Sequence, residues 1–367
     1  MVIYHKNIDK KMETKMKIGI VLYFCNYFGG AERRLLRIYN SLADNIQIDL
    51  IVRGGNKKQF KKSAELADVN LDNFTNIIFT GGRIKTLLCI KRENYSTIQI
   101  FDKSRFNIYL LRFCKIISVK TICTFADFHD SYGLINEKAK SILERQVKLI
   151  DKIDVLYPRG KIFFEQLSGK ANVYITPGTF TDLDLFYPKE KKNIMIFAAA
   201  RLELEKNPWL IINACKLCCE EIRKNKYQIW IMGRGYEEER IRNDIIKNKL
   251  DDIIIMKGYQ KTSDILPFAR VFFAVGKMEN YPSQSQAEAT ASGCYIISTN
   301  VADSKLMVSD KFSVLIEDKA AALSHEIINY ILESEEEKNQ YIKAAREFAL
   351  EKFNIKRSIE YFGKMIM

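Results

Sequence analysis

The sequence predicts an α/β protein built from two Rossmann-like, doubly wound parallel-sheet domains. Three observations lead to this prediction. The chain has 367 residues, enough for two domains of ordinary size. From residue 17 onward, short apolar runs typical of buried parallel strands alternate with amphipathic helical patterns. One connection at 176–188, rich in Pro, Gly and Asp, interrupts the alternation and marks a domain boundary.

Four segments follow from this boundary. Residues 1–15 are polar and Lys-rich and lack the apolar core of a secretory signal, so they are predicted to be a flexible extension. Residues 16–180 form the first predicted sheet domain and residues 181–354 the second. The helical pattern at 355–367 is expected to pack back on the first domain.

The apolar runs predict seven strands in the first domain and six in the second. In the first domain the strands are predicted at 17–24, 46–52, 76–80, 97–101, 118–125, 154–157 and 173–176. In the second they are predicted at 194–200, 228–232, 253–256, 271–275, 295–298 and 313–316. Open parallel sheets bind ligands at the carboxyl ends of their strands, so the loops that follow these runs are where functional residues are expected.

Composition excludes some classes of protein. A hydrophobic content of 47% and a charged content of 28% are ordinary for a globular protein, and no apolar run reaches the length of a transmembrane helix. No two pairs among the eight cysteines have zinc-ribbon spacing, and so many free thiols suit a reducing cytoplasm. Cys215, Cys218 and Cys219 have the spacing of a helical core stripe.

Positive charge is concentrated in the first half of the chain. Residues 1–186 hold 30 Lys and Arg against 19 Asp and Glu, whereas the net charge of the whole chain is +13. This excess favours an anionic partner, such as a membrane face, a phosphorylated acceptor or nucleic acid. A Lys-rich surface without a partner is the equally open alternative. The basic amphipathic segment 56–62 is either a solvated face or a membrane contact.

The most informative stretch runs from Glu279 to Gly293, between two predicted strands. Its serines indicate a helix start, and a helix N-terminus offers free N–H groups that suit a diphosphate. Glu288 allows two interpretations. Paired with Ser285 it has capping-box spacing, but with Ser283 as the N-cap it lies in the second turn, free to bind a ribose diol.

A second group of charged residues follows the first strand of the second domain. Arg201 and Lys206 precede Pro208, which fits the first position of a helix. Two cations beside a helix N-terminus can hold a diphosphate and stabilise it as a leaving group. Surface ion pairs with Glu203 and Glu205 are the alternative.

Glycine turns end three of the predicted strands. Gly29-Gly30 follows the first strand, and it is neither a Walker A loop nor a dinucleotide fingerprint. Gly233-Arg234-Gly235 and Lys257-Gly258-Tyr259 follow two strands of the second domain. Asp127 and His129 follow the strand at 118–125, where either a site or a structural role is open.

Taken in order, these pieces resemble a GT-B glycosyltransferase of the retaining family 4 type, over nearly the whole chain from Met16. The GT-B fold implies two Rossmann-like domains facing across a cleft. The motifs that carry the resemblance are Gly29-Gly30-Ala31-Glu32-Arg33, Thr176-Pro177-Gly178, Arg201-Leu202 with Glu205-Lys206-Asn207-Pro208, Gly233-Arg234-Gly235, Lys257-Gly258-Tyr259, and Glu279-Asn280-Tyr281-Pro282 with Glu288-Ala289 and Gly293.

The resemblance implies roles for individual residues. Arg201 and Lys206 match the diphosphate clamp, Glu288 the ribose-binding glutamate, and Glu279 the glutamate that faces the donor sugar. Further donor contacts are implied for Gly29, Gly30, Gly233, Arg234, Lys257, Gly258, Tyr281, Pro282 and Ser283, and Asp127 and His129 are candidates on the acceptor side.

Two departures from the family pattern leave roles open. Eight residues separate Glu279 from Glu288 where the family has seven, so either Glu279 or Asn280 fills the first position. The family often has a histidine at the end of the strand corresponding to 118–125, whereas His129 lies further on and no catalytic histidine is assigned.

The chemistry implied is transfer of a sugar from a nucleotide-diphosphate donor to a hydroxyl of a bacterial surface glycan or its lipid-linked precursor, with retained configuration. Neither a metal nor another cofactor is expected, because the two cations neutralise the leaving group and Asp182-Leu183-Asp184 suits a turn. The expected location is the cytoplasm, at the inner face of the membrane. The rival functions are a sugar-nucleotide epimerase or hydrolase on the same fold and, remotely, a non-catalytic nucleic-acid binder, although no nucleic-acid-binding module is present.

Overall fold

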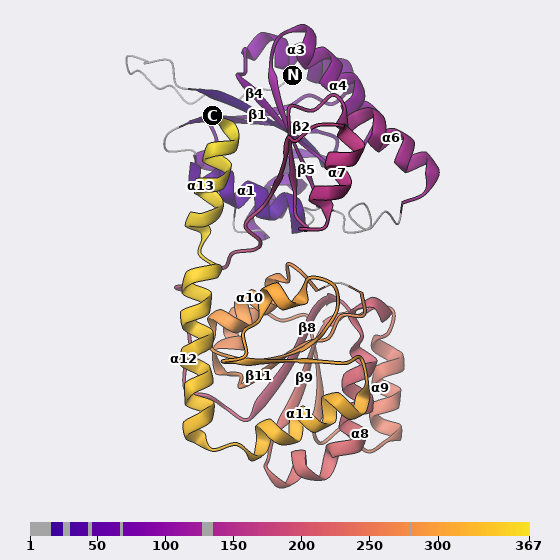
Figure 1. The fold of residues 1–367 in the computed structure, drawn as a ribbon, viewed down its shortest axis with the longest axis vertical. Helices are drawn as coiled ribbons and strands as arrows, with labels where there is room; N and C mark the ends of the chain where they lie inside the picture. Colours follow the sequence, from indigo (N-terminus) through magenta and orange to yellow (C-terminus); the bar gives the residue numbers. More distant parts are fainter. Residues whose placement is uncertain (1–15, 25–29, 43–45, 67–68, 127–134, 279) are drawn as a thin grey trace. The chain divides into compact units, whose positions relative to one another are not determined.

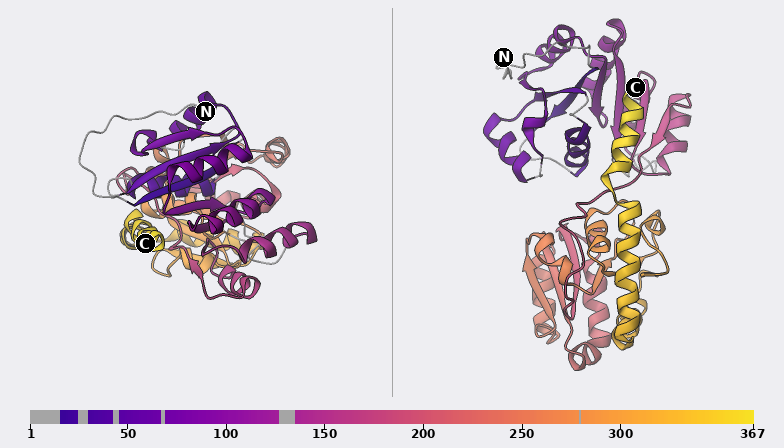
Figure 2. Two further views of the ribbon diagram at one scale, coloured as in Figure 1. Left: turned by 90° about the horizontal axis from the view of Figure 1, so that it is seen from above. Right: turned by 90° about the vertical axis from the view of Figure 1, so that its left-hand side faces the viewer.

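The computed structural model describes residues 16–24, 30–42, 46–66, 69–126, 135–278 and 280–367, which fall into two compact units. The first unit runs up to Pro177 and takes in Lys356–Met367, and the second is Gly178–Ile355. Each unit is a parallel sheet flanked by helices (Figures 1 and 2). Two doubly wound α/β units are the fold class that the sequence predicts, and the structure confirms it.

The first unit has a seven-stranded sheet with the strand order β3-β2-β1-β4-β5-β6-β7, in which every pairing is parallel. Its elements are β1 (Lys17–Tyr23), α1 (Gly30–Leu42), β2 (Gln47–Arg53), α2 (Lys57–Leu66), β3 (Asn76–Phe79), α3 (Arg83–Glu93), β4 (Thr97–Phe101), α4 (Arg105–Ile116), β5 (Lys120–Phe125), α6 (Glu137–Val147), β6 (Lys152–Val155), α7 (Gly160–Ser168) and β7 (Val173–Ile175). The order reverses between β1 and β4, so this pair of strands is the topological switch point of the sheet.

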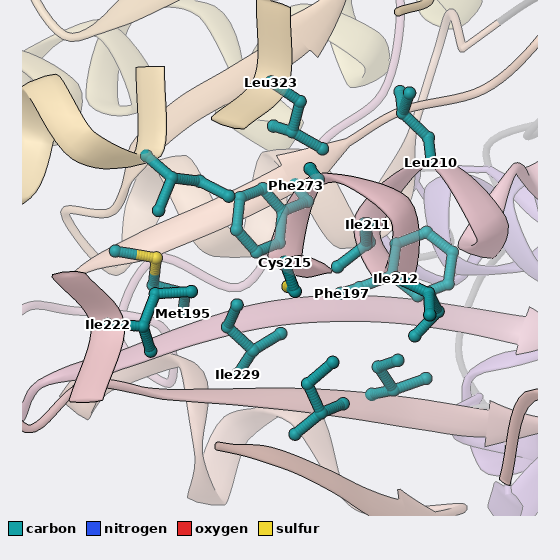
Figure 3. Close-up of a cluster of buried hydrophobic side chains, with 14 of the residues drawn as sticks. Met195, Phe197, Leu210, Ile211, Ile212, Cys215, Ile222, Ile229, Phe273 and Leu323 are labelled. Atoms are coloured by element: carbon teal, nitrogen blue, oxygen red, sulfur yellow. The ribbon is translucent and has the colours of Figure 1, made fainter. Parts of the chain in front are cut away.

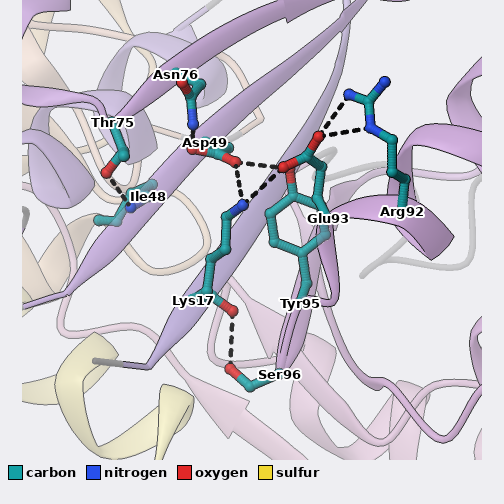
Figure 4. Close-up of polar contacts among 9 residues, drawn as sticks. All are labelled: Lys17, Ile48, Asp49, Thr75, Asn76, Arg92, Glu93, Tyr95 and Ser96. Carbon is teal, nitrogen blue, oxygen red and sulfur yellow. Dashed lines mark hydrogen bonds and ion pairs between the residues drawn. The ribbon is translucent and has the colours of Figure 1, made fainter. Parts of the chain in front are cut away.

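A buried polar cluster closes the amino end of this sheet (Figure 4). Asp49 is fully buried in β2, and its carboxylate accepts hydrogen bonds from Tyr95 and Asn76, each at 2.8 Å. Lys17 at the start of β1 completes the cluster with ion pairs to Asp49 at 3.2 Å and to Glu93 at 2.9 Å. Because the buried carboxylate is paired and hydrogen-bonded, it carries little of the cost of an isolated buried charge. The cluster therefore serves the fold, at the opposite end of the sheet from the carboxyl ends of the strands, where open α/β sheets bind ligands.

The last helix, α13 (Ile355–Ile366), packs on the first unit beside α1 (Figure 1). The ring of Phe362 lies 5.8 Å from that of Tyr39 in α1. The hydroxyl of Tyr361 donates a 2.7 Å hydrogen bond to Asp154, which is fully buried in β6 and also accepts one from Thr124 at 2.8 Å. Burial raises the pKa of the Asp154 carboxyl. These contacts explain why a terminal segment is well anchored to a sheet that the chain left far earlier.

The second unit has a six-stranded parallel sheet with the order β10-β9-β8-β11-β12-β13. Its elements are β8 (Ile194–Arg201), α8 (Pro208–Lys224), β9 (Gln228–Arg234), α9 (Glu238–Lys247), β10 (Ile254–Gly258), β11 (Val271–Ala274), α10 (Gln284–Ala291), β12 (Tyr295–Thr299), β13 (Ser313–Ile316), α11 (Ala320–Leu332) and α12 (Glu335–Lys352). The switch point lies between β8 and β11, which pair through Val271 with Met195 and Phe272 with Ile196.

The core of the second unit fills the space between this sheet and α8, α9 and α11 (Figure 3). Strand residues such as Ile229 and Phe273 pack there against helix residues such as Leu323. The cysteines at 215 and 218 are buried in the same core, and Cys219 packs against it, which confirms the predicted core stripe. Burial raises the pKa of the Cys215 and Cys218 thiols, so both behave as small apolar groups.

No helix in the described part of the chain is both long enough and apolar enough to cross a lipid bilayer. The predicted turn role of Asp182 is confirmed, because its carboxylate accepts hydrogen bonds from the backbone N–H groups of Asp184 at 3.0 Å and Leu185 at 2.9 Å. Among the described residues there is no cluster of His, Cys, Asp and Glu that could hold a metal ion.

Candidate functional site

The switch point of the second sheet brings together the loops that the sequence singled out. β8 ends at Arg201, β11 ends at Ala274, and the two strands are neighbours. The crevice beyond the carboxyl ends of such a pair is where open α/β sheets bind ligands. The loops after β8 and β11 are joined by a 3.1 Å backbone hydrogen bond from Lys277 to Glu205. The loop after β8 carries Lys206 beyond Arg201, and the loop after β11 leads into α10.

Arg201 and Lys206 lie on the β8 side, and both are exposed. Arg201 forms a 3.3 Å ion pair with Glu203 and keeps 73% of its side-chain surface exposed. This confirms one of the two surface pairs considered from the sequence. Lys206 ends a short 3₁₀ turn at Leu204–Lys206 and has no ion-pair partner among the described residues. Two exposed cations beside the start of α8, one of them unpaired, suit a clamp that closes on an anionic ligand.

The turn into α8 is fixed by a buried asparagine. Asn207 is 4% exposed, adopts the left-handed conformation with φ 58°, and donates a 2.7 Å hydrogen bond to Asp318. Pro208 then takes the first helical position, as the sequence predicts. Because Asn207 is tied down, the position of Lys206 one residue before it is set by the fold.

On the other side, α10 begins where Ser283 caps it. The hydroxyl of Ser283 accepts a hydrogen bond from the backbone N–H of Gln286 at 3.3 Å. Glu288 consequently lies in the second turn, half-buried, and accepts hydrogen bonds from Thr262 at 2.8 Å and Gln284 at 3.1 Å. The alternative of a capping box between Ser285 and Glu288 is wrong, because the helix starts two residues earlier than that pairing requires.

The loop between β11 and α10 is held by the side chain of Asn280. Its amide nitrogen lies 3.2 Å from the carbonyl oxygen of Ala274 and 3.2 Å from Oε1 of the fully buried Gln286. Tyr281 is 9% exposed, and a Cβ added to Gly178 would come within 2.9 Å of its hydroxyl. The side chain of Asn280 thus ties the loop to the end of β11 and to α10.

Two glycines at the end of β9, Gly233 inside the strand and Gly235 just after it, serve close packing. Gly233 has φ 127°, and a Cβ added there would overlap the carbonyl oxygen of Ala199 in β8. A Cβ on Gly235 would likewise overlap the backbone of Leu202. Between them, the carbonyl of Arg234 accepts a 2.8 Å hydrogen bond from Leu202. Packing of β9 against the end of β8 therefore accounts for both glycines and presents the exposed Arg234 at the edge of the sheet.

Lys257 and Gly258 end the neighbouring β10. The ammonium group of Lys257 lies 3.9 Å from the ring centroid of Trp230, a cation–π contact. Gly258 has φ 62°, and a Cβ added there would approach the Nε of Arg234 to 3.7 Å, an ordinary contact. Five cationic residues thus lie at or just after the carboxyl ends of strands in the second sheet, namely Arg201, Lys206, Arg234, Lys257 and Lys277.

The sequence did not predict a role for two residues near these strand ends, Lys277 and Thr262. Lys277 lies three residues after the end of β11, a position that could have drawn attention to it. Thr262 carried no signal, because only the fold brings it to Glu288, 26 residues further along the chain. Of the other candidates, Gly30 is the first residue of α1. Gly29, Asp127, His129 and Glu279 lie outside the described residues.

The comparisons with known proteins agree on a single class. Residues 183–348, most of the second unit, match the family model described as "Glycosyl transferases group 1". The chain is 25% identical over 228 residues to the GalNAc-alpha-(1->4)-GalNAc-alpha-(1->3)-diNAcBac-PP-undecaprenol alpha-1,4-N-acetyl-D-galactosaminyltransferase of Campylobacter jejuni, covering 60% of this chain and 62% of that protein. It is 29% identical over 188 residues to WcaL of Escherichia coli, named as a candidate colanic acid biosynthesis glycosyltransferase, covering 47% and 46%. The chain thus spans less than two thirds of the length of these curated relatives.

Solved structures extend the likeness to almost the whole chain. Anabaena HepE, in a complex with UDP and glucose, superposes with a TM-score of 0.74 at 14% identity and covers 96% of this chain and 99% of its own. The pneumococcal O-GlcNAc transferase GtfA, in a complex with UDP and GlcNAc, gives 0.72 at 12% identity, with coverage of 96% and 99%. At such identities the likeness concerns the fold, which is the GT-B fold.

Proposed function

We propose that this chain, whose second unit carries a glycosyl transferases group 1 domain, is a glycosyltransferase that moves a sugar from a nucleoside diphosphate to a hydroxyl acceptor with retained configuration. One observation carries the proposal. The β8–β11 switch point has Arg201 and Lys206 on one side and Glu288, in the second turn of α10, on the other. This arrangement suits a nucleoside diphosphate. The complexes of HepE and GtfA with UDP support this choice of ligand.

In this function each group has a task set by its chemistry. Arg201 and Lys206 bind the diphosphate and offset the negative charge that develops as it leaves the sugar. Glu288 accepts hydrogen bonds from the ribose diol, and its place near the N-terminus of α10 suits a negative charge. The N–H groups at the start of α10 add donors for the phosphates. Either Glu279 or Asn280 is proposed to contact the donor sugar.

The acceptor is proposed to be a bacterial surface glycan or its lipid-linked precursor. The Campylobacter relative is named for an undecaprenol-linked acceptor, and the Escherichia coli relative for colanic acid biosynthesis. For an acceptor of this kind, we propose that the reaction takes place at the cytoplasmic face of the membrane. An epimerase or hydrolase on the same fold would show itself by turnover that does not depend on an acceptor.

Calorimetry with UDP tests the role of Glu288. Glu288→Gln keeps the shape of the side chain but loses the charge, so UDP binding should weaken by about 1.5–3 kcal/mol, or roughly 10- to 150-fold. Glu239→Gln, an exposed glutamate of α9, makes the same change away from the site and should bind UDP like the wild type. If folded Glu288→Gln also binds UDP like the wild type, Glu288 has only a structural role and the proposal loses its main support.

Chelation tests the prediction that no metal is needed. Transfer activity should survive EDTA, because the clamp supplies positive charge at the leaving group. The measurement is the rate of sugar transfer before and after chelation, with Mg²⁺ or Mn²⁺ added back. Complete loss that is restored by either ion would contradict the prediction and point to a carboxylate site.

The first unit is further proposed to contact an anionic membrane through α2. This helix carries Lys57, Lys58, Lys61 and Lys62, and it borders a cavity of about 300 Å³. Apolar side chains of α2 and β3, including Phe60, Ile77 and Phe79, line much of that cavity. Charge complementarity favours an anionic lipid surface as the partner.

Vesicle sedimentation measures this contact. Binding to vesicles with anionic lipid should weaken as salt rises through about 0.15 M, where the Debye length is about 8 Å. Removing three charges from α2 (K58Q, K61Q and K62Q) should reduce binding, whereas removing three from the second unit (K224Q, K247Q and K249Q) should not. Equal loss in both triple variants, or binding that ignores salt, would exclude α2 as the contact.

A further inference from the structure

An arginine lies over the switch point of the first sheet. Arg53 is the last residue of β2, and its guanidinium carbon lies 3.7 Å from the ring centroid of Phe106 and 5.5 Å from that of Tyr23. Tyr23 ends β1, and Phe106 is in the first turn of α4, which follows β4. The side chain of Arg53 therefore reaches from β2 across the end of β1 toward β4, where a doubly wound sheet binds its ligand.

A second arginine, Arg83, follows β3, whose end is tied to the end of β2 by a 3.0 Å hydrogen bond from the N–H of Thr80 to the carbonyl of the residue before Arg53. Neither arginine forms an ion pair with an acidic side chain among the described residues. Arg83 is the exposed first residue of α3. Burial, and then the like charge of Arg83, lower the pKa of Arg53. Other arginines of the chain do have carboxylate partners, such as Arg223 with Asp252 at 2.7 Å. Two neighbouring guanidinium groups without a counter-charge repel each other, and an anion between or beside them would relieve that repulsion.

The backbone fixes Arg53 in this position. Gly54 and Gly55 follow it with φ 79° and 60°, and a Cβ on either would run into Phe24. The N–H of Phe24 also donates a 2.8 Å hydrogen bond to the carbonyl of Arg53. The end of β2 is thus locked to the end of β1, while Phe106 supports the guanidinium from one side.

The approach to Arg83 is open by contrast. A Cβ added to Gly81 or Gly82, which precede Arg83, would meet no atom within 4 Å. Tyr23 is 67% exposed, so an aromatic ring stands uncovered beside the Arg53 guanidinium. The site thus combines the rigid Arg53, the more accessible Arg83 and the exposed ring of Tyr23. This combination suits a group that is both anionic and partly apolar.

We propose that Arg53 and Arg83 bind an anionic group of the acceptor, a phosphate, a diphosphate or a carboxylate, at the switch point of the first sheet. Guanidinium groups bind such oxyanions through two parallel hydrogen bonds, which a lysine cannot reproduce. The assignment of this anion to the acceptor rests on the proposed glycosyltransferase function, in which the nucleotide occupies the second unit. It restricts the acceptors to those that carry a negatively charged group.

Hydrogen–deuterium exchange on the full chain locates anion binding without knowledge of the acceptor. UDP is present at saturation, so that the second unit is already occupied. Inorganic pyrophosphate is then added as the probe for a phosphate-linked acceptor, and glucuronate as the probe for an acidic sugar. We expect one of them to slow exchange in the segments 53–55 and 81–86. Failure of both at millimolar concentration would overturn the inference.

Variants show which side chains hold the probe. R53Q and R83Q should each weaken the protecting probe at least about tenfold, as expected for hydrogen bonds to a charged group. R53K should retain part of the binding, and R112Q, which removes an exposed arginine from α4, should change nothing. Arg83 is exposed, so R83Q tests the site with little risk to folding. Undiminished protection in R83Q and R53Q would overturn the inference.

The two proposals fail in different ways. If UDP protects the second unit but neither probe protects the first, the nucleotide site stands and the acceptor site is wrong. If a probe protects 53–55 and 81–86 through both arginines while UDP leaves the second unit unprotected, the anion site stands and the glycosyltransferase proposal is wrong. Once an acceptor is found, R53Q and R83Q should raise its KM more than they lower kcat.

Discussion

Lys206→Ala is expected to lower kcat by about 10²–10³-fold, the cost of removing one preorganised group that stabilises a developing anion. Lys206 is exposed and has no ion-pair partner among the described residues, so its loss leaves no buried charge behind and the fold should persist. Arg201→Ala is expected to cost at least as much, because it also leaves the carboxylate of Glu203 without its partner at 3.3 Å. That carboxylate would then repel the diphosphate.

The measurement is steady-state transfer from the nucleotide sugar, with the melting temperature as a check on folding. Lys247→Ala provides the matched control, since it removes an exposed lysine from the last turn of α9 in the same unit. The double variant should lose less than the product of the two single effects if the cations act as one clamp. Wild-type kcat in both single variants would mean that the charges after β8 take no part in the reaction.

The strands of both sheets were largely predictable, because a parallel strand buried on both faces is a continuous apolar run. β4 and β13 have the predicted limits, Thr97–Phe101 and Ser313–Ile316. β6 is the main exception, predicted at 154–157 but observed at Lys152–Val155. A fully buried aspartate in mid-strand breaks the apolar pattern there. Hydrogen bonds from Thr124 and Tyr361, which are distant in sequence, help to stabilise Asp154 there.

The candidate site was predictable only in part, for a similar reason. The residues that end strands could be named, since the carboxyl ends of parallel strands share one edge. Local spacing could not decide whether Ser283 or Ser285 caps α10, because both fit a helix start. The hydrogen bond from Thr262 to Glu288 and the pairing of Arg201 with Glu203 depend on how the loops fold. Pattern reasoning therefore identifies positions, whereas the partners of each side chain come from tertiary structure.

Gly233 shows how far this ambiguity reaches, because a glycine at the end of a strand suits both a ligand contact and tight packing. The family resemblance implies that Gly233 is a donor-binding residue. In the structure, its φ of 127° and the overlap that any Cβ would have with the carbonyl of Ala199 give it a packing role. The two roles predict different behaviour when a single methyl group is added.

Gly233→Ala is expected to destabilise the second unit by about 4 kcal/mol, the combined cost of a strained backbone and an overpacked contact. Hydrogen exchange in β8 and β9, together with the melting temperature, would measure this loss. Gly258→Ala is the matched control in the same unit, because it has a positive φ of 62° but only an ordinary contact at 3.7 Å. It should cost about 1 kcal/mol, for the backbone alone. If Gly233→Ala is instead as stable as Gly258→Ala and loses only UDP binding, the glycine serves the ligand and the packing explanation is wrong.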